Sequence, residues 1–303
     1  MIVRWGLEEL PRVLADTGID RPLLVSGARW DALAIPAASR WSEIPSDRIV
    51  VPRDADGILA IGGGSAIDTA KAASAGAGLP LVSVPTTYSG AEWTAFFGVR
   101  SPDRRQVGGG SGARLAGIVY DPELTLDLPR AESGGTALNA LAHCVEALYP
   151  GELEDARRGA AGIDRWLPRV LEDGHDLEAR RGLLEAASDA GQALAKHGLF
   201  LGHAMAQALG GRYGLPHGAM NAICLPLAMC FNMSVCPWAM TAVSVERVEE
   251  LARLAGFTRL REFGVPEAEL DDVAEAVAAR PGAVANPRPA SAAEISELLR
   301  AVW

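Results

Sequence analysis

The chain has 303 residues, of which 49% are apolar, and it carries a formal net charge of −10. This length allows one large or two medium domains with sizeable cores, and the apolar content excludes a disordered chain. The negative charge argues against nucleic acid or an anionic membrane as a partner, because both would repel the protein.

Short apolar strands alternate with helices in the first half of the chain. Strands rich in β-branched residues and separated by short helices are typical of a parallel α/β sheet. We expect the tract Gly108–Gly112 to be a flexible loop. One helix is predicted over Ala66–Ala75, and one strand ends at Tyr120. The remaining predicted strands are Pro22–Gly27, Arg48–Pro52, Gly57–Ile61 and Pro80–Pro85.

From about Arg130 onward, apolar residues recur at helical spacing, so the second half is predicted to be all-helical. We therefore expect an α/β domain over residues 1–128 and a helical domain over residues 129–303. The clearest predicted helices are Ser133–Leu148, Leu177–Leu201, Ser244–Leu254 and Ser291–Trp303.

Three glycines, Gly62, Gly63 and Gly64, separate a predicted strand from a predicted helix. Glycines at this position let the backbone approach an anion, which then faces the positive end of the helix. Ser65 follows and can cap the helix and donate to a phosphate oxygen. Lys71, two turns into the helix, is predicted to be a surface charge. The pattern is neither GxGxxG nor a P-loop, and it predicts a phosphate site.

The run GGGSAIDTAK at residues 62–71 resembles the nucleotide loop of the iron-containing (type III) alcohol dehydrogenase superfamily. The run VPTTYSGAEWT at residues 84–94 resembles the block that contacts the diphosphate and nicotinamide in that superfamily. PTTYSGAE, LNALAHCVEALY, LGGRYGLPH and NPRP resemble its maleylacetate reductase branch, whose members reduce a carbon–carbon double bond of maleylacetate with NADH or NADPH. Other segments resemble the superfamily in the same order: Tyr120–Thr125, Leu138–His143, Gly202–Asn232 and Asn286–Pro289.

The resemblance implies a type III alcohol dehydrogenase (dehydroquinate synthase-like) fold, with an α/β nucleotide-binding domain before an all-α catalytic domain. It also implies a cytoplasmic homodimer that binds NADPH or NADH in the cleft between the domains and acts on a small molecule. The residues implied for the cofactor are Gly62, Gly63, Gly64, Ser65, Asp68, Thr86, Thr87 and Ser89.

Asn139, His143, His203 and His217 stand where the superfamily has the one aspartate and three histidines that bind its metal ion. A neutral amide compensates the charge of a hard divalent ion poorly, and maleylacetate reductases commonly carry asparagine here. We therefore expect catalysis without iron or zinc; a bound metal would use these same four residues. The three histidines, Asn139 and Tyr88 are the catalytic candidates.

Three further residues are candidates for substrate contact. Gln207 stands where the superfamily often places another histidine, and its amide can hydrogen-bond but cannot act as an acid or base near neutral pH. A carboxylate substrate needs a cation, for which Arg105 and Arg212 are the candidates.

The first domain is shorter than the resemblance leads us to expect. Only Pro52–Asp56 separate two predicted strands, where relatives place a helix on the order of 15–20 residues long, as a parallel crossover requires. Gly27 replaces the acidic residue that holds the ribose in NAD-preferring relatives, and the nearby Arg29 could accept the 2′-phosphate of NADPH.

These features predict a metal-independent NAD(P)H-dependent reductase of a small unsaturated or oxo acid. The shortened domain, Asn139 and Gln207 leave open a repurposed member that catalyses a non-redox cyclisation, dehydration or isomerisation in a biosynthetic pathway. A metal-dependent alcohol dehydrogenase and a non-catalytic binding protein are the remaining alternatives.

Overall fold

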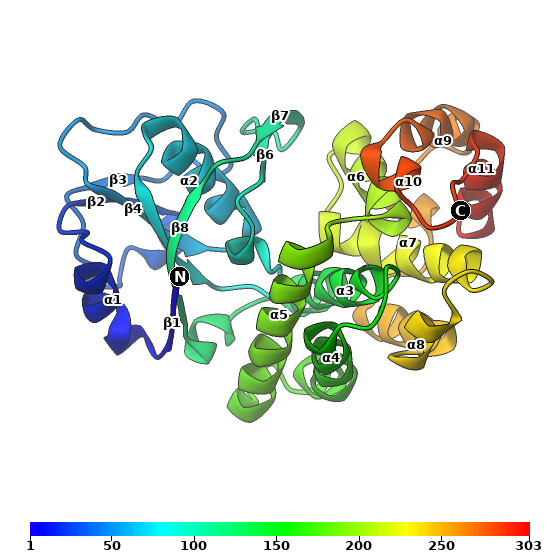
Figure 1. Cartoon of the computed structure of the whole chain (residues 1–303), viewed down its shortest axis with the longest axis horizontal. Helices are drawn as coiled ribbons and strands as arrows, with labels where there is room; N and C mark the ends of the chain where they lie inside the picture. The colour runs from blue at the N-terminus through cyan, green and yellow to red at the C-terminus, as the bar shows by residue number, and fades with distance from the viewer. The chain divides into compact units, whose positions relative to one another are not determined.

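A computed structural model describes all 303 residues, which divide into two compact units, Met1–Asp127 and Leu128–Trp303. The first unit is α/β and the second is all-helical (Figure 1), as the sequence predicted. None of the helices is long and apolar enough to cross a membrane.

The first unit contains a six-stranded, fully parallel sheet with strand order β1-β8-β5-β4-β2-β3, and a separate antiparallel hairpin, β6-β7. Its strands are β1 (Ile2–Trp5), β2 (Pro22–Ser26), β3 (Ser39–Trp41), β4 (Gly57–Gly62), β5 (Pro80–Pro85), β6 (Phe97–Arg100), β7 (Gln106–Gly110) and β8 (Arg114–Tyr120). Its helices are α1 (Leu10–Asp16) and α2 (Gly64–Ala77).

The two helices cover opposite faces of the sheet because side chains alternate along each buried strand. On β4, Leu59 and Ile61 pack in the cluster that holds α1, whereas Ile58 and Ala60 pack in the cluster that holds α2. Both faces of the central strands are therefore buried, and the near-continuous apolar run of β4 reflects this. The layering places the end of β4 directly before the start of α2.

Two local predictions in this unit were wrong. Residues 48–52 form no strand, since the strand that pairs with β2 is β3; Ile49 and Val51 are apolar because they pack on the core beside the sheet. The glycine tract is largely strand β7 rather than a flexible loop. A Cβ on Gly110 would lie 2.9 Å from the Phe97 ring, so the glycines allow β7 to approach β6.

The connections on both sides of β3 contain no α-helix, although every strand in this sheet is parallel to its neighbours. Residues 42–56 join β3 to β4 as irregular chain. The crossover helix that the resemblance leads one to expect is therefore absent from this unit.

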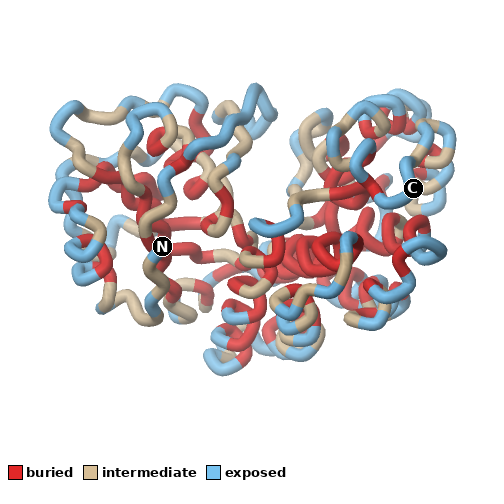
Figure 2. The backbone as a smooth tube through the Cα atoms, viewed as in Figure 1, coloured by how far each residue is buried: buried red, intermediate tan, exposed pale blue.

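The second unit is built around one central helix, α3 (Arg130–Ala147), which is buried on nearly all sides (Figure 2). The predicted helix Leu177–Leu201 is interrupted at Gly198, which has a φ of +78° and ends α5. The other helices are α4 (Glu154–Glu172), α5 (Leu177–His197), α6 (Leu201–Tyr213), α7 (His217–Asn232), α8 (Val245–Ala255), α9 (Leu270–Ala278), α10 (Pro281–Val284) and α11 (Ala292–Ala301).

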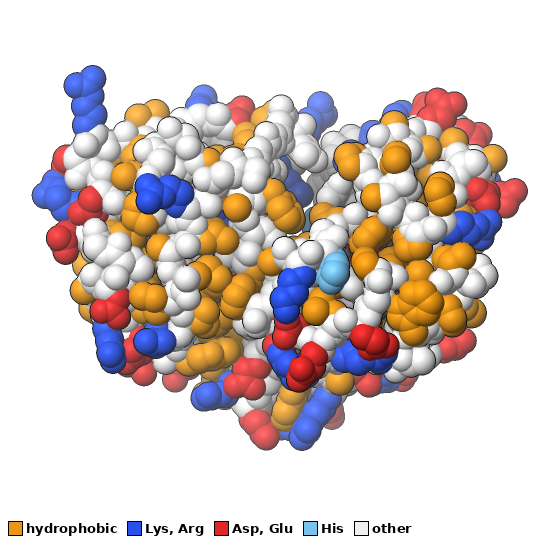
Figure 3. All heavy atoms as spheres, in the orientation of Figure 1, with side chains coloured by type: hydrophobic (Ala, Val, Ile, Leu, Met, Phe, Trp, Pro, Cys, Tyr) orange, Lys and Arg blue, Asp and Glu red, His pale blue; other side chains and the backbone are white.

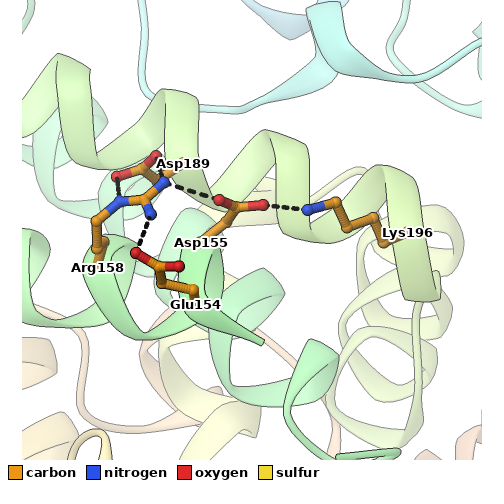
Figure 4. A network of polar contacts seen from close by, with 5 residues as sticks. All are labelled: Glu154, Asp155, Arg158, Asp189 and Lys196. Carbon is orange, nitrogen blue, oxygen red and sulfur yellow. Dashed lines mark hydrogen bonds and ion pairs between the residues drawn. The ribbon is translucent and has the colours of Figure 1, made fainter. Parts of the chain in front are cut away.

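The surface carries interspersed positive and negative side chains (Figure 3). Figure 4 shows one such network between α4 and α5, where Arg158 lies 2.9 Å from Asp189 and 3.0 Å from Glu154, and Asp155 joins Arg158 to Lys196. Because Arg158 is 48% exposed, each of these pairs contributes less than about 1 kcal/mol to stability. The buried contacts of α4 and α5, rather than this network, hold the two helices together.

Candidate functional site

The turn between β4 and α2 has a geometry that lets a ligand approach its backbone closely. Gly62 has a φ of +151°, a conformation that favours glycine. A Cβ on Gly63 would lie 2.8 Å from Thr87 Cγ2, and a Cβ on Gly64 would lie 3.4 Å from Ser89 Oγ. Helix α2 begins at Gly64, and no side chain caps its first turn. Its first N–H groups are therefore available to an anion at the positive end of a 14-residue helix.

The segment after β5 forms the other wall of this turn. The backbone N–H of Thr86 donates to the Gly62 carbonyl at 3.0 Å. Thr87 Oγ1 is buried and has no hydrogen-bond partner in the protein. A buried hydroxyl without a partner is destabilising unless a ligand or water supplies one. The glycine turn, Thr87 and Ser89 together fit the polar diphosphate of a dinucleotide, and we call this group the glycine cradle.

Ser65, Asp68 and Lys71, near the glycine cradle, have contacts that the sequence did not indicate. Ser65 is the second residue of α2, so it does not cap the helix. Asp68, predicted to contact the cofactor, accepts instead from the Gly98 N–H and from Lys71 Nζ, each at 3.3 Å. Asp68 thus ties α2 to β6, and burial raises the pKa of its carboxyl.

Lys71 is buried rather than exposed. Its Nζ donates to Thr94 Oγ1 and to the Phe96 carbonyl at 3.0 Å, and burial lowers the pKa of the amine. These acceptors come from a segment more than 20 residues away in sequence. Nothing in the helical pattern of α2 alone indicates them.

Tyr88, a catalytic candidate from the sequence, packs inside the first unit, and a catalytic role for it stays a prediction. Its side chain is fully buried, and its hydroxyl donates to Thr125 Oγ1 at 3.4 Å. Thr125 Oγ1 in turn donates to the Pro122 carbonyl at 2.7 Å. The hydroxyl therefore connects two loops of the first unit.

At the end of β2, Gly27 leaves open space where a side chain would project. Arg29 is exposed, and its guanidinium stacks 4.5 Å from the centre of the Trp30 ring. No carboxylate lies within 4.0 Å of Arg29, so its charge is available to an anion. The expectation that it accepts a 2′-phosphate stays a prediction.

The second unit brings the three predicted histidines together. Helix α3 carries Asn139 and His143, helix α6 carries His203, and His217 is the first residue of α7. The His143 and His203 rings stack with their centres 4.7 Å apart, and the His203 and His217 rings lie 5.8 Å apart. His143 and His203 are buried, whereas His217 is half-buried. We call this group the imidazole cluster.

Small residues allow α7 to reach α3 at this point. A Cβ on Gly218 would lie 2.4 Å from the backbone carbon of Gly135, so the two helices touch backbone to backbone. This contact carries the adjacent His217 toward the face of α3 that presents Asn139 and His143. The spacing of four residues between Asn139 and His143 keeps both on that face.

A chain of hydrogen bonds crosses the imidazole cluster. Asn221 Nδ2 donates to Asn139 Oδ1 at 2.8 Å and lies 3.0 Å from His217 Nε2, which makes that ring nitrogen an acceptor. His217 therefore carries its proton on Nδ1. Asn139 Oδ1 also lies 3.3 Å from His203 Nε2.

Glu146, which sequence reasoning missed, holds the other side of His203. Its carboxylate is fully buried and accepts from His203 Nδ1 at 2.8 Å, from the Phe200 N–H at 2.7 Å and from the His203 N–H at 3.1 Å. It therefore caps α6 and orients one of its histidines. A Cβ on Gly202 would lie 2.9 Å from Glu146 Oε1, so only glycine leaves room for this contact. Glu146 is three residues after His143 on the same helix, and this spacing was the sequence signal that could have placed it near the histidines.

Both ring nitrogens of His203 thus face acceptors. A carboxylate can only accept, so Nδ1 carries a proton, and a second proton on Nε2 would point at Asn139 Oδ1. The surroundings accommodate an imidazolium whose charge is balanced by Glu146. His143 differs, because its Nδ1 has no partner and its pKa lies well below the usual value, first through burial and then through the neighbouring His203 and His217 rings.

The substrate candidates separate into one that lies near the imidazole cluster and two that do not. Gln207 lies one helical turn after His203, and its Oε1 accepts from Arg280 Nη1 at 3.3 Å. Arg212 is a surface residue whose guanidinium binds Glu269 Oε2 at 2.7 Å. Arg105 is exposed and lies 3.5 Å from Asp103. Because carboxylates of the protein pair with Arg212 and Arg105, both are weaker candidates for the substrate's cation than an arginine without an acidic partner.

Comparisons with known proteins give the family. The C-terminal model of the Fe-containing alcohol dehydrogenase family matches residues 134–303, and the iron-containing alcohol dehydrogenase model matches residues 48–120. Together these matches cover most of the chain. This protein belongs to the iron-containing alcohol dehydrogenase family. Its curated relatives include maleylacetate reductases at 30% and 33% identity, which supports that branch of the family, and the protein is an oxidoreductase.

Maleylacetate reductase from Pseudomonas sp. (strain P51) is 33% identical over 262 residues, which cover 82% of this chain and 74% of the relative. Maleylacetate reductase from Agrobacterium tumefaciens has a TM-score of 0.86 at 26% identity, covering 100% of this chain and 95% of that one. An iron-containing alcohol dehydrogenase from Corynebacterium glutamicum has a TM-score of 0.87 at 27% identity, covering 100% and 94%. These similarities confirm the predicted fold.

The family name implies a metal ion, and the imidazole cluster can be tested for one. The residue that would supply the anionic ligand is Asn139, whose neutral Oδ1 is already bonded to Asn221. The nearby carboxylate, Glu146, is turned to the far nitrogen of His203 and to backbone N–H groups. No group of three or more His, Cys, Asp or Glu side chains is arranged to hold a metal ion. The residues present therefore do not fit the expected one-carboxylate, three-imidazole site.

Proposed function

We propose that this protein is an NAD(P)H-dependent reductase of a small oxo or unsaturated acid, similar to maleylacetate reductase, and that it works without a metal ion. The observation that carries the proposal is the imidazole cluster, in which the buried carboxylate of Glu146 lies on Nδ1 of the buried His203 and can balance the charge of a protonated ring. Its relatives in the maleylacetate reductase branch support the reaction class.

The glycine cradle is the part of the protein that would hold the cofactor. Its helix terminus, Thr87 hydroxyl and close-packed glycines suit a diphosphate, as described above. When bound, NADH or NADPH supplies a hydride. Thr87 would donate to a diphosphate oxygen, and Gly63 would leave room for the backbone to approach it.

The imidazole cluster would act on the substrate. Reduction of a carbonyl, or of a double bond conjugated with one, places negative charge on the carbonyl oxygen. The positive charge of a protonated His203, whose Nε2–H is directed at Asn139 Oδ1, would stabilise this negative charge through the buried cluster, while Glu146 keeps the ring oriented. His217 presents a neutral ring, which can take up or release a proton at its half-buried position. No step of this scheme requires a Lewis acid.

The experiment is a titration of purified protein with NADH and NADPH, followed by tryptophan fluorescence and by calorimetry. We expect micromolar to sub-millimolar binding of at least one of them. Gly63→Val should abolish this binding, because the added side chain would meet Thr87. Thermal melting of the variant separates lost binding from lost folding, and Gly64→Ala, whose Cβ has only ordinary contact with Ser89, gives a milder second test. Failure of both nucleotides to bind at millimolar concentration would overturn the proposal and favour the non-redox alternative.

The metal question needs a separate measurement. Oxidation of NAD(P)H by maleylacetate should be unchanged after incubation with EDTA, and protein purified without chelator should contain less than stoichiometric iron or zinc. Loss of activity in EDTA that added Zn²⁺ or Fe²⁺ restores would show that the metal-independent mechanism is wrong.

A further inference from the structure

Arg280 is a cation without an anionic partner. It immediately precedes α10, and its side chain is half-buried. Its single hydrogen bond runs from Nη1 to Gln207 Oε1 at 3.3 Å, and its Nε is buried with no partner at all. No carboxylate lies within 4.0 Å of it, in contrast with Arg212 on the neighbouring helix α6. Burial accordingly lowers the pKa of Arg280, and no acidic group opposes this.

A partly buried guanidinium without an anionic partner destabilises the folded protein when no ligand is bound. Removing a charge from water costs free energy that an ion pair or full hydrogen bonding normally offsets. Here a neutral amide provides one acceptor, and the Nε–H is left without any. A carboxylate would satisfy it, because the two oxygens of a carboxylate match the parallel N–H groups of arginine in a bidentate pair.

The position of Arg280 relates it to the imidazole cluster through α6. Gln207, which it contacts, is four residues after His203 and therefore on the same face of that helix, about 6 Å along its axis. Helix α10 lies close to the start of α6, since a Cβ on Gly282 would be 2.8 Å from the Phe200 carbonyl oxygen. The guanidinium and the imidazolium of His203 thus belong to one face of the second unit.

We propose that Arg280 binds a carboxylate group of the substrate, with Gln207 orienting its guanidinium. The inference rests on the proposed function for the role of His203, and it adds the class of substrate. A guanidinium without an acidic partner at this position selects an anionic group, so the substrate class is an acid whose carboxylate is bound by Arg280 while its reacting carbon lies toward the imidazole cluster.

Equilibrium binding of adipate, an unreactive six-carbon dicarboxylate, tests this assignment without any turnover. Calorimetry would compare the wild-type protein, Arg280→Gln, Arg280→Lys and the matched surface control Arg212→Gln. We expect Arg280→Gln to weaken adipate binding about 10- to 100-fold, as loss of a charge-assisted bidentate pair does. Arg280→Lys should retain part of the affinity, and Arg212→Gln should retain all of it. Dimethyl adipate, which has no charge, should bind the wild type and Arg280→Gln equally.

Three results would overturn the proposal. The first is that the wild type does not bind adipate at about 10 mM, a concentration above the usual range of KM values. The others are that Arg280→Gln binds adipate as tightly as the wild type, or that Arg212→Gln loses as much affinity as Arg280→Gln. Melting temperatures of all variants exclude a folding defect, and Arg280→Lys serves as the second variant if Arg280→Gln does not fold. The outcome is independent of the cofactor. If neither nucleotide binds but adipate binds through Arg280, the reductase proposal fails while the carboxylate site stands.

Discussion

Glu146→Gln is the substitution that isolates the charge beneath the imidazole cluster, because it preserves the shape of the side chain. The wild-type carboxylate accepts three hydrogen bonds, one at Oε1 from the His203 N–H and two at Oε2 from the Phe200 N–H and His203 Nδ1. Glutamine has one acceptor oxygen. Its NH₂ group must therefore face at least one of these donors, whichever way the amide is turned.

The loss of stability can be estimated from these contacts. One buried donor loses its acceptor, at about 1–3 kcal/mol, and the others lose the charge that strengthened their bonds and stabilised the start of α6. A total near 3 kcal/mol is expected, which lowers the melting temperature by about 6–12 °C for a unit of this size. Gly202→Ala should act in the same direction, because its Cβ would press on Glu146 Oε1.

The functional effect is the more specific one. Without the carboxylate, a protonated His203 is no longer charge-balanced, so kcat with maleylacetate should fall about 100-fold, as loss of a preorganised donor does. Nucleotide affinity should be unchanged. Imidazole ¹⁵N NMR of the wild type should show a protonated, hydrogen-bonded Nδ1 on His203, and this signal should shift when the carboxylate is replaced by an amide. Glu132→Gln, at an exposed position of α3, is the control. Wild-type melting and wild-type kcat in Glu146→Gln would refute the assigned role of the carboxylate.

Three other substitutions test neighbouring arguments. Asn139→Asp should create a Zn²⁺ site by adding a carboxylate to three imidazoles, and calorimetry showing no gain over the wild type would contradict the ligand argument. Because the folded state depresses the pKa of His143, only the unfolded state binds a proton at this residue just below about pH 6.5, and the unfolding free energy therefore falls on acidification. In urea unfolding, the difference in unfolding free energy between pH 5 and pH 8 should be smaller in His143→Gln than in the wild type. Lys71→Met leaves Asp68 without its buried cation and should lower the unfolding free energy by about 3 kcal/mol, whereas Arg12→Met on the surface should change it by less than about 0.5 kcal/mol.

The sequence predicted the architecture wherever the pattern of apolar residues in a segment depends only on the structure of that segment. The β4 run Gly57–Gly62 is apolar at every position because helices cover both faces of the sheet, and the glycines that follow begin α2. The same logic fails when a residue's environment comes from far along the chain. Lys71 looks like a surface residue in the helical pattern, yet its acceptors lie on the segment that enters β6.

The candidate site was predictable to the same extent. The positions of Asn139, His143, His203 and His217 follow from motifs, and the structure places them in one cluster. Arg280 belongs to no motif, and it meets Gln207 across 73 positions of sequence. Arg212, a candidate from the sequence, is five residues after Gln207 on α6, and on a helix a side chain at that spacing points to a different face.

The location of the buried carboxylate beside the imidazole cluster determines what this cluster can do. With an acidic residue at position 139, a carboxylate and three imidazoles would converge on a divalent cation, which can hold a developing oxyanion but cannot give it a proton. Here the carboxylate belongs to Glu146, which contacts Nδ1 of His203. In the proposed metal-free mechanism the positive charge of the cluster is a proton on an imidazole ring, which would stabilise the oxyanion, and the half-buried His217 would transfer a proton to it. A site of this kind is suited to reduction, in which hydride addition must be followed by protonation, more than to oxidation of an unactivated alcohol, which requires stabilisation of an alkoxide.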